Sequence, residues 1–328
     1  MIDASRRAAA GALCAALGSV AWPAWAQAPA WPAKPIRLVV PFPPGGGTDL
    51  AARIVAERLS ARLGQPVVID NKPGASTAIG IVSVSAAEPD GHTLLFSGSS
   101  SYTVNPAVRV KLGYDPFKQL SPIAMVARAP LVLVTSGAGP YKSVKDVLAK
   151  AASSPTAITY ATFGSGSAPH LAGELLAYAA SVKLSPIPYK GSAEAAIGII
   201  RGDISLGIDT IAAANPHLQS GKLRALAVIS EKRTPLLPGV PAYGELQLSP
   251  ALLDAWYAVA APAGISPALR EQVLRSLTQV MAEPEVKKKL ALQSMESTLL
   301  GPQALREVMD SEITRYRAVV ARTGMRTD

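Results

Sequence analysis

The sequence predicts an α/β protein of two lobes, each a mostly parallel sheet flanked by helices, with a hinged cleft between the lobes. Short apolar runs of strand length alternate with segments of helical periodicity along the chain. This alternation occurs twice, and two apolar extended segments, 123–126 and 131–135, separate the two series. No short period recurs, which excludes solenoids and propellers.

The N-terminus carries the features of a secretory signal peptide. Arg6 and Arg7 precede an apolar run, 8–20, and Pro23 and the small-x-small triplet 24–26 follow that run. The run falls short of the ~20 residues that a bilayer-spanning helix needs. We therefore predict that residues 1–26 are a cleaved signal peptide and that the mature chain is an exported, soluble protein.

Composition excludes several classes of function. Cys14 lies in the predicted leader and is the only cysteine, so the mature chain has no disulfide, zinc–thiolate site or cysteine nucleophile. The 32 Lys and Arg residues against 23 Asp and Glu residues give a formal net charge of +9, which suits anionic partners. The one basic cluster, 287–289, has no interleaved aromatic residues, so we expect no nucleic acid partner.

The first lobe is predicted to comprise residues 27–127 together with 254–328. It opens with a strand at 36–42 and a helix at 48–63, whose apolar residues recur near helical spacing before Gly64 ends it. The remaining elements expected in this lobe are strands at 67–69, 93–96 and 255–260, and helices at 77–87, 267–281, 285–292 and 303–323.

The second lobe is predicted to comprise residues 128–253. Ser143 and Asp146 have the spacing of a capping box before a helix that ends near Ala152. The elements that follow are expected to be strands at 158–161, 187–189, 204–209 and 225–229, and helices at 171–180, 193–201 and 211–219. More than one chain crossing between two such lobes implies a hinge and a cleft, a favoured place for small ligands.

The segment 41–49 is the most informative motif for function, since it lies between a strand and a helix. Its prolines stiffen the loop, and its glycines let the backbone approach a ligand closely. The free N–H groups of the next helix turn and the helix dipole favour an anion. The alternative is a plain tight turn; the glycine spacing matches neither a Walker motif nor a dinucleotide fingerprint.

A second glycine- and serine-rich segment, 163–170, also follows a strand and precedes a helix. Its hydroxyl and amide groups are candidates to hold the other end of an anion. It does not match the Gly-x-Ser-x-Gly pattern of hydrolases, so we do not expect Ser165 or Ser167 to be a nucleophile. His170 and Glu174 share one helix face, which we interpret as packing or capping rather than as a metal site.

Three further segments end predicted strands, where open α/β sheets bind ligands. Ser99 and Ser100 belong to a serine-rich segment that is either a hydrogen-bonding loop or a flexible surface loop. Asp209 and Gly191 end two strands of the second lobe. Lys190 is equally consistent with a ligand contact and with a surface charge.

The chain resembles the tripartite tricarboxylate transporter substrate-binding receptors, also called the Bug family, over essentially the whole mature sequence. The motifs that carry this resemblance are WPAKPIR (31–37), VPFPPGGGTD (40–49), NKPGA (71–75), GSGSAPH (164–170), YKGS (189–192) and APAG (261–264). The resemblance implies a type II periplasmic binding protein fold that closes on a small organic acid.

The resemblance also implies how the acid is held. One carboxylate is expected to bind between the first strand–helix loop and the glycine–serine loop of the other lobe. The residues that correspond are Phe42, Gly46, Thr48 and Asp49 on one side and Ser165, Ser167, His170 and Gly191 on the other. Asp49 is either a partner for a ligand ammonium group or a residue that stabilises its own helix.

These observations predict a periplasmic receptor that captures a small organic carboxylate or acidic amino acid and delivers it to a two-subunit membrane permease. We expect a monomer without catalytic activity, metal or cofactor. The alternative is a receptor of the same fold that presents its ligand to a sensor or regulatory partner.

Overall fold

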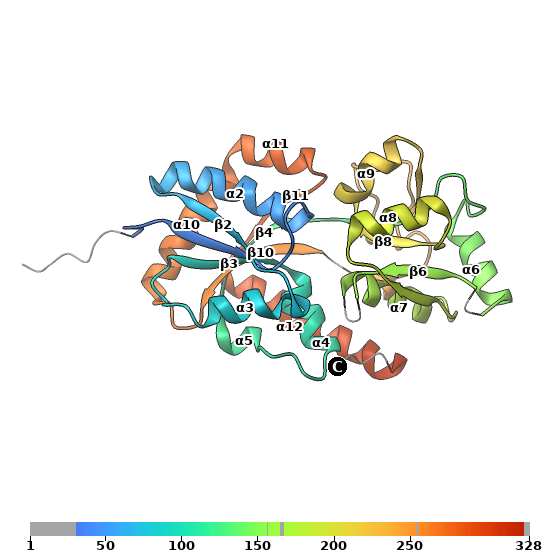
Figure 1. Cartoon of the computed structure of the whole chain (residues 1–328), viewed down its shortest axis with the longest axis horizontal. Helices are drawn as coiled ribbons and strands as arrows, with labels where there is room; N and C mark the ends of the chain where they lie inside the picture. The colour runs from blue at the N-terminus through green and yellow to red at the C-terminus, as the bar shows by residue number, and fades with distance from the viewer. Residues whose placement is uncertain (1–30, 156, 165–166, 254, 325–328) are drawn as a thin grey trace, which may run out of the picture.

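The chain folds into two α/β bodies that lie side by side (Figure 1). The computed structural model describes residues 31–155, 157–164, 167–253 and 255–324. The predicted signal peptide and Ser165 lie outside these residues. None of the helices in the described part of the chain has both the length and the apolar character needed to cross a bilayer.

The first body, lobe 1, is built on a sheet of six strands within the described residues, in the order β11-β4-β10-β3-β1-β2. Strand β1 pairs in parallel with β2 and β3, whereas β10 runs antiparallel to β3 and β4, and β11 runs antiparallel to β4. The sheet is therefore mixed. Its strands are β1 (Ile36–Val40), β2 (Val67–Asn71), β3 (Thr93–Gly98), β4 (Leu120–Arg128), β10 (Trp256–Pro262) and β11 (Glu296–Leu300).

Helices cover both faces of this sheet, which explains why its inner strands β1, β3 and β10 are mostly apolar and buried. One face carries α2 (Gly47–Leu63), α10 (Pro267–Ala282) and α11 (Pro284–Leu292), which form one apolar core with the sheet. The other face carries α3 (Ala78–Ser85) and the first half of α12 (Pro302–Thr323).

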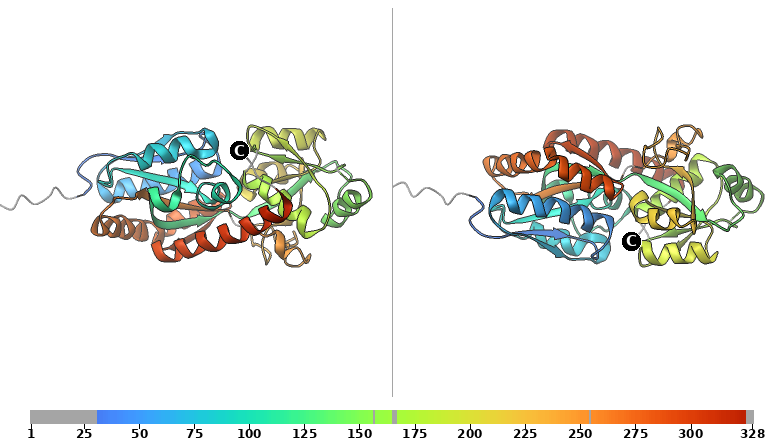
Figure 2. Two further views of the ribbon diagram at one scale, coloured as in Figure 1. Left: turned by 90° about the horizontal axis from the view of Figure 1, so that it is seen from below. Right: turned by 90° about the horizontal axis from the view of Figure 1, so that it is seen from above.

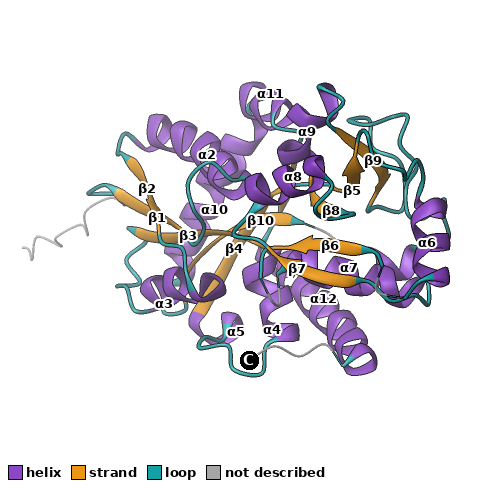
Figure 3. Cartoon of the chain, turned by 45° about the vertical axis from the view of Figure 1, so that its right-hand side comes forward, coloured by secondary structure: helices purple, strands orange, loops and turns teal. Residues whose placement is uncertain are grey.

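The second body, lobe 2, contains a three-stranded sheet in the order β8-β5-β9 and the parallel pair β6-β7 (Figure 3). A bridge between Tyr160 and Leu206 joins the two. The strands are β5 (Leu131–Ser136), β6 (Thr159–Thr162), β7 (Ser185–Pro188), β8 (Gly207–Thr210) and β9 (Leu223–Val228). Helices α6 (Val144–Ser153) and α7 (Ala168–Ala179) share one core with the sheet, and α8 (Ser192–Arg201) and α9 (Ile211–Gln219) share the other.

Local sequence signals correspond closely to these elements. The predicted capping box is present, since Ser143 Oγ accepts from the amide of Asp146 and Asp146 accepts from the amide of Ser143. The prediction did not include strand β11 or the short helices α4 (Asn105–Val108) and α5 (Pro116–Gln119). Strand β11 lies at a sheet edge and is mostly half-exposed, so it lacks the apolar run that marks the inner strands.

One prediction is wrong at the end of β3. The serine-rich segment there was expected to be a loop, but it continues as a helix, with Ser100–Val104 wound as a single wide turn (η2) that leads directly into α4. Ser97, Ser99 and Ser101 are buried. The helix is stabilised by local hydroxyl bonds, because Ser97 and Ser101 share a hydrogen bond and Thr103 Oγ1 donates to the carbonyl of Ser99.

Helix α12 spans both lobes. Its first half contributes Leu305 and Met309 to a core of lobe 1, and its second half contributes Tyr316, Val319 and Val320 to a core of lobe 2. Figure 2 shows this helix, in red, running from one lobe to the other. The lobe boundaries near residues 127 and 254 stay a prediction, to which the packing adds a C-terminal helix that both lobes share.

Candidate functional site

Among the described residues, most of the functional residues predicted from the sequence lie at or just beyond the ends of strands, where the chain passes between the lobes. Strand β4 ends at Arg128, and β5 starts at Leu131 in the other sheet. At this end of the sheets, Tyr257 at the start of β10 pairs with Gly98, and Thr210 at the end of β8 pairs with Leu131. We call this region the inter-lobe junction.

The glycine-rich loop and the start of α2 form the lobe 1 side of the junction. Gly46 is the N-cap of α2 with extended backbone angles, and a Cβ atom on it would meet open space, 4.0 Å from the carbonyl of Pro43. Gly47 is tightly packed, since a Cβ atom there would lie 2.6 Å from the hydroxyl of Tyr257. The first amides of a helix have no carbonyl partner within it, so this end can receive an anion.

Asp49 holds the loop in place. Its carboxylate accepts hydrogen bonds from the amide of Gly45 (2.9 Å), from Arg53 (2.8 and 3.0 Å) and from Asn71 Nδ2 (3.0 Å). Burial acts to raise the pKa of Asp49, but the bonds from Arg53, Gly45 and Asn71 outweigh it and hold the pKa below its ordinary value. Both carboxylate oxygens are therefore committed to protein donors, which favours the loop-stabilising interpretation over a contact with a ligand ammonium group.

Asn71 fastens the same loop from the neighbouring strand. Its Nδ2 also donates to the carbonyl of Phe42, at 3.0 Å. Phe42 is half-buried against the core of lobe 1. The predicted residues Phe42, Gly46, Thr48 and Asp49 thus belong to one loop–helix unit.

Tyr257 connects the two sides of the junction. Burial raises the pKa of its hydroxyl, and the nearby negative charge of Asp209 in lobe 2 raises it further, while a hydrogen bond with Thr48 acts in the opposite direction. The Tyr257 hydroxyl therefore lies beside the α2 loop of its own lobe and interacts electrostatically with Asp209 of the other lobe.

The lobe 2 side of the junction includes the start of α7. Ser167 is the N-cap of this helix, and its Oγ accepts from the amide of Phe163 at 3.1 Å. His170 lies one turn later, where burial lowers its pKa and the neighbouring Glu174 opposes that effect. Glu174 accepts from the hydroxyl of Tyr160 at 2.7 Å.

Gly191 and Asp209 meet at the start of α8. Gly191 is the N-cap of α8, and the next residue, Ser192, donates from its hydroxyl to Asp209 Oδ2. The amide of Thr210 donates to Asp209 Oδ1 at 2.7 Å. Burial raises the pKa of Asp209 to about 6, although the bonds from Ser192 and Thr210 act to lower it.

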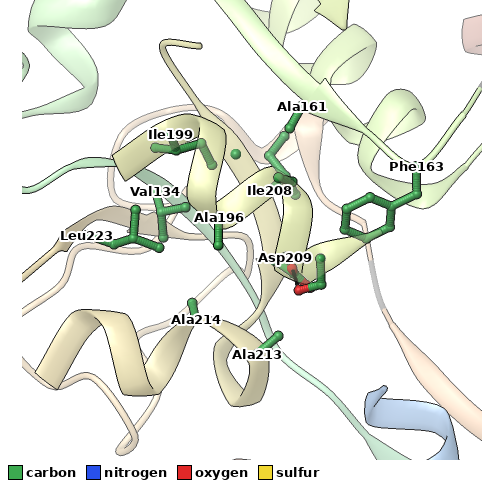
Figure 4. A pocket seen from close by; sticks show the side chains of 13 residues that line it. Val134, Ala161, Phe163, Ala196, Ile199, Ile208, Asp209, Ala213, Ala214 and Leu223 are labelled. Carbon is green, nitrogen blue, oxygen red and sulfur yellow. Dashed lines mark hydrogen bonds between the residues drawn. The ribbon is translucent and has the colours of Figure 1, made fainter. Parts of the chain in front are cut away.

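A small cavity of about 20 Å³ extends behind these residues into lobe 2 (Figure 4). Asp209 and Phe163 lie on one side of it, and Val134, Ile199 and Leu223 lie on the other. This volume holds one water molecule or a methyl group, but not a whole organic acid. The cavity therefore adjoins the junction at Ser192 and Asp209 and is too small to be the ligand site itself.

The structure brings most of the predicted residues that it describes to the junction. Ser165 lies outside the described residues, and Ser99 and Ser100 differ from the prediction in their local structure. Ser99 is buried within its helical segment and Ser100 is half-buried there, so neither belongs to the hydrogen-bonding loop that was predicted. Sequence reasoning did not select Tyr257 or Ser192 as site residues. Tyr257 lies beside Gly47 and Thr48, and Ser192 donates to Asp209. The partners in each pair are far apart in the sequence, so no local sequence pattern indicates these contacts.

The backbone beside the junction is strained after β2. Ala75, Ser76 and Thr77 all have positive φ angles, between 44° and 80°, a conformation that costs free energy in non-glycine residues. Asn105 Nδ2 donates to the carbonyl of Ser76 at 2.6 Å and so helps to hold it. Within the described residues, no group of three or more His, Cys, Asp or Glu side chains could hold a metal ion.

The sequence matches the family model described as the tripartite tricarboxylate transporter family receptor over residues 51–325. BugT of Bordetella pertussis is 35% identical over 299 residues, covering 91% of this chain and 92% of BugT. A UPF0065 protein in the gbd 5' region of Cupriavidus necator is 33% identical over 324 residues, covering 97% and 96% of the two chains.

Solved structures share the whole fold. Rpa4515 of R. palustris, solved with adipate, superposes with a TM-score of 0.84 at 32% identity, covering 90% of this chain and 99% of that chain. MatC of Rhodopseudomonas palustris, with bound malate, gives a TM-score of 0.81 at 27% identity, covering 88% and 100%. A further structure, of a periplasmic transporter, gives 0.84 at 33% identity and covers 91% and 100%. The predicted periplasmic binding protein fold is confirmed.

Proposed function

Because the chain belongs to the tripartite tricarboxylate transporter receptor family, we propose that it is a periplasmic receptor that captures a small organic carboxylate and delivers it to a two-subunit membrane permease. The observation that carries this proposal is the exposed start of α2. Gly46 has no side chain to cap the helix, and Asp49 anchors the loop in front of it by accepting a hydrogen bond from the amide of Gly45.

The ligand carboxylate would bind where the helix dipole and the first-turn amides of α2 point. Thr48 and Tyr257 add hydroxyl groups beside these amides. Backbone amides and hydroxyl groups are already oriented by the fold, so binding costs little reorganisation. The Ser167 and Gly191 helix ends of lobe 2 would complete the enclosure from the other side.

The bound acids of two relatives support a carboxylate as the ligand. Rpa4515 was solved with adipate and MatC with malate. Both acids carry two carboxylates, yet one has a hydroxyl group and the other does not. We propose a carboxylate for this chain on these grounds, and we infer a binding role without catalysis, because the matching family model and the similar solved structures are those of transport receptors and periplasmic binding proteins.

A thermal-shift screen tests the proposal. Residues 27–328, stripped of co-purified ligand, are screened against mono-, di- and tricarboxylates, acidic amino acids and aromatic acids. A ligand at about one hundred times its Kd stabilises the native state by about 2.7 kcal/mol, which raises Tm measurably. Deleting the gene should then abolish cellular uptake of the acid that binds.

Two glycine substitutions make the screen specific to the site. Gly46→Val places a branched side chain where the carboxylate is proposed to bind, and we expect at least about tenfold weaker affinity, equivalent to 1.4 kcal/mol. Gly301→Val is the matched control, because Gly301 is also a helix N-cap with extended angles and open space around it, but it precedes α12 at the far end of the sheet. Equal affinities of the two variants would contradict the proposed carboxylate site.

A further inference from the structure

Asp209 is a carboxylate at the inter-lobe junction that makes no ion pair with a cation among the described residues. Its only partners among the described residues are two neutral donors, the hydroxyl of Ser192 and the amide of Thr210. Asp49, on the other side of the junction, is neutralised by Arg53. A partly buried carboxylate without a cation is costly, and it is kept where something else supplies the missing donor.

The surroundings of Asp209 do not supply that donor. Behind it lies the small cavity, whose lining is apolar apart from Asp209 and Ser192. In front of it, from β10 of lobe 1, lies the ionisable hydroxyl of Tyr257. That hydroxyl hydrogen-bonds with Thr48, beside the start of α2, and among the described residues no hydrogen bond joins it to Asp209. Each oxygen of Asp209 accepts one hydrogen bond and retains capacity for another.

We propose that Asp209 receives a hydrogen-bond donor of the ligand, a hydroxyl or ammonium group carried close to the carboxylate, so that the receptor prefers hydroxy or amino acids to the plain acids of the same skeleton. This inference rests on the proposed function, since it requires the ligand carboxylate to bind at the start of α2. Asp49 has no capacity for this role, because Gly45, Arg53 and Asn71 saturate its oxygens.

The physical basis is a charge-assisted hydrogen bond. A donor that reaches an ionised carboxylate binds more strongly than one that reaches a neutral acceptor. Burial raises the pKa of Asp209 to about 6, so the group is mostly ionised at neutral pH. A second ligand carboxylate in the same place would instead be repelled by a like charge.

Titration calorimetry with two matched series of acids tests the inference. The series are propionate, lactate and alanine, and succinate, malate and aspartate. In each series the skeleton and carboxylates are constant while a hydroxyl or an ammonium group is added. We expect the wild-type receptor to bind the hydroxy acid or the amino acid at least about tenfold more tightly than the plain acid. Whichever substituted acid binds more tightly shows whether the donor is a hydroxyl or an ammonium group.

Two variants assign the preference to Asp209. Asp209→Asn should reduce it to less than about threefold, partly by improving the binding of the plain acid. Asp203→Asn is the matched control, with the same charge change at an exposed residue beyond the other end of the strand, and should retain the wild-type preference. Ser192→Ala removes an internal donor from Asp209, so the preference should persist or increase.

Several outcomes would overturn the inference. Plain acids that bind as tightly as their substituted partners, or a preference that survives in Asp209→Asn, would show that Asp209 does not contact the ligand. A purely structural role predicts that Asp209→Asn and Ser192→Ala weaken all acids in parallel without changing the preference. If no acid binds to any variant or to the wild type, it is the proposed function that fails.

Discussion

Two aspartates of the inter-lobe junction show how residues of one type acquire different properties. Asp49 and Asp209 each stand beside the start of a helix and each accept backbone and side-chain hydrogen bonds. Arg53 makes the difference, because its guanidinium group favours the ionised form of Asp49 and lowers its pKa, whereas burial dominates at Asp209 and raises its pKa.

The raised pKa of Asp209 makes the stability of the empty receptor depend on pH. Between the ordinary pKa of 3.8 and about 6, the unfolded chain ionises while folded Asp209 retains its proton, so stability falls as pH rises and then levels off. Asp209→Asn removes this loss. We expect the free energy of unfolding of Asp209→Asn, relative to that of the wild type, to increase with pH by no more than about 3 kcal/mol, the equivalent of two pKa units.

Urea denaturation of both proteins at pH 4, 5, 6, 7 and 8 measures this difference. The difference should grow up to about pH 6 or 7 and then remain constant. A difference that is the same at every pH would mean that the folded and unfolded states ionise alike at this residue.

At the scale of elements, the three adjacent glycines of the glycine-rich loop, Gly45, Gly46 and Gly47, have different structural roles. Gly45 has a φ of +85°, a conformation that glycine adopts without steric cost. Gly46 leaves space in front of the helix, and Gly47 allows β10 to approach. The loop can therefore lie close to both Tyr257 and a ligand.

Alanine substitutions separate the last two roles. Gly47→Ala places a methyl group against the hydroxyl of the buried Tyr257, and we expect a loss of about 1–3 kcal/mol in the free energy of unfolding, typical of overpacking. Gly46→Ala should leave it within about 0.5 kcal/mol. Equal stabilities of the two variants in chemical denaturation would show that β10 yields to the extra methyl group.

At the scale of the whole molecule, α12 connects the two apolar cores. Glu312 lies between its two halves and accepts from the indole of Trp256 at 3.0 Å and from Thr103 at 2.8 Å. Any closure of the lobes must carry this helix along or shift its second half in lobe 2. Trp256 is fully buried and stacked on Tyr102, so its fluorescence should respond to movement at this crossing.

Removing the aromatic anchor of α12 should weaken the contact between lobes. Tyr316 is fully buried in the lobe 2 core, and Tyr316→Ala should cost about 3–5 kcal/mol, as large-to-small core substitutions do. Ser311→Ala, on the exposed face of the same helix, is the control and should change stability by less than about 0.5 kcal/mol. If both variants melt like the wild type in calorimetry, α12 does not hold the lobes together.

Much of the architecture could be predicted because its signals are local. The alternation of apolar runs and helical periods predicted the α/β class, and the Ser143–Asp146 capping box predicted the start of α6. Helix α2 ends at Leu63 and Gly64 adopts the left-handed conformation that a glycine stop provides. Each of these depends on interactions between residues a few positions apart.

The junction chemistry was decided by tertiary structure. The serine-rich segment after β3 became a helix because its hydroxyl groups bond within a buried turn, which its composition alone does not indicate. Asp49 could be either a ligand contact or a helix residue until Asn71 and Gly45 were seen to share its oxygens. Tyr257 approaches Gly47, and Ser192 reaches Asp209, across long stretches of chain. The sequence by itself therefore determined most of the elements and the family motifs. Folding alone decided which carboxylate pairs with a cation and which has only neutral donors among the described residues, because that depends on distances between residues remote in sequence.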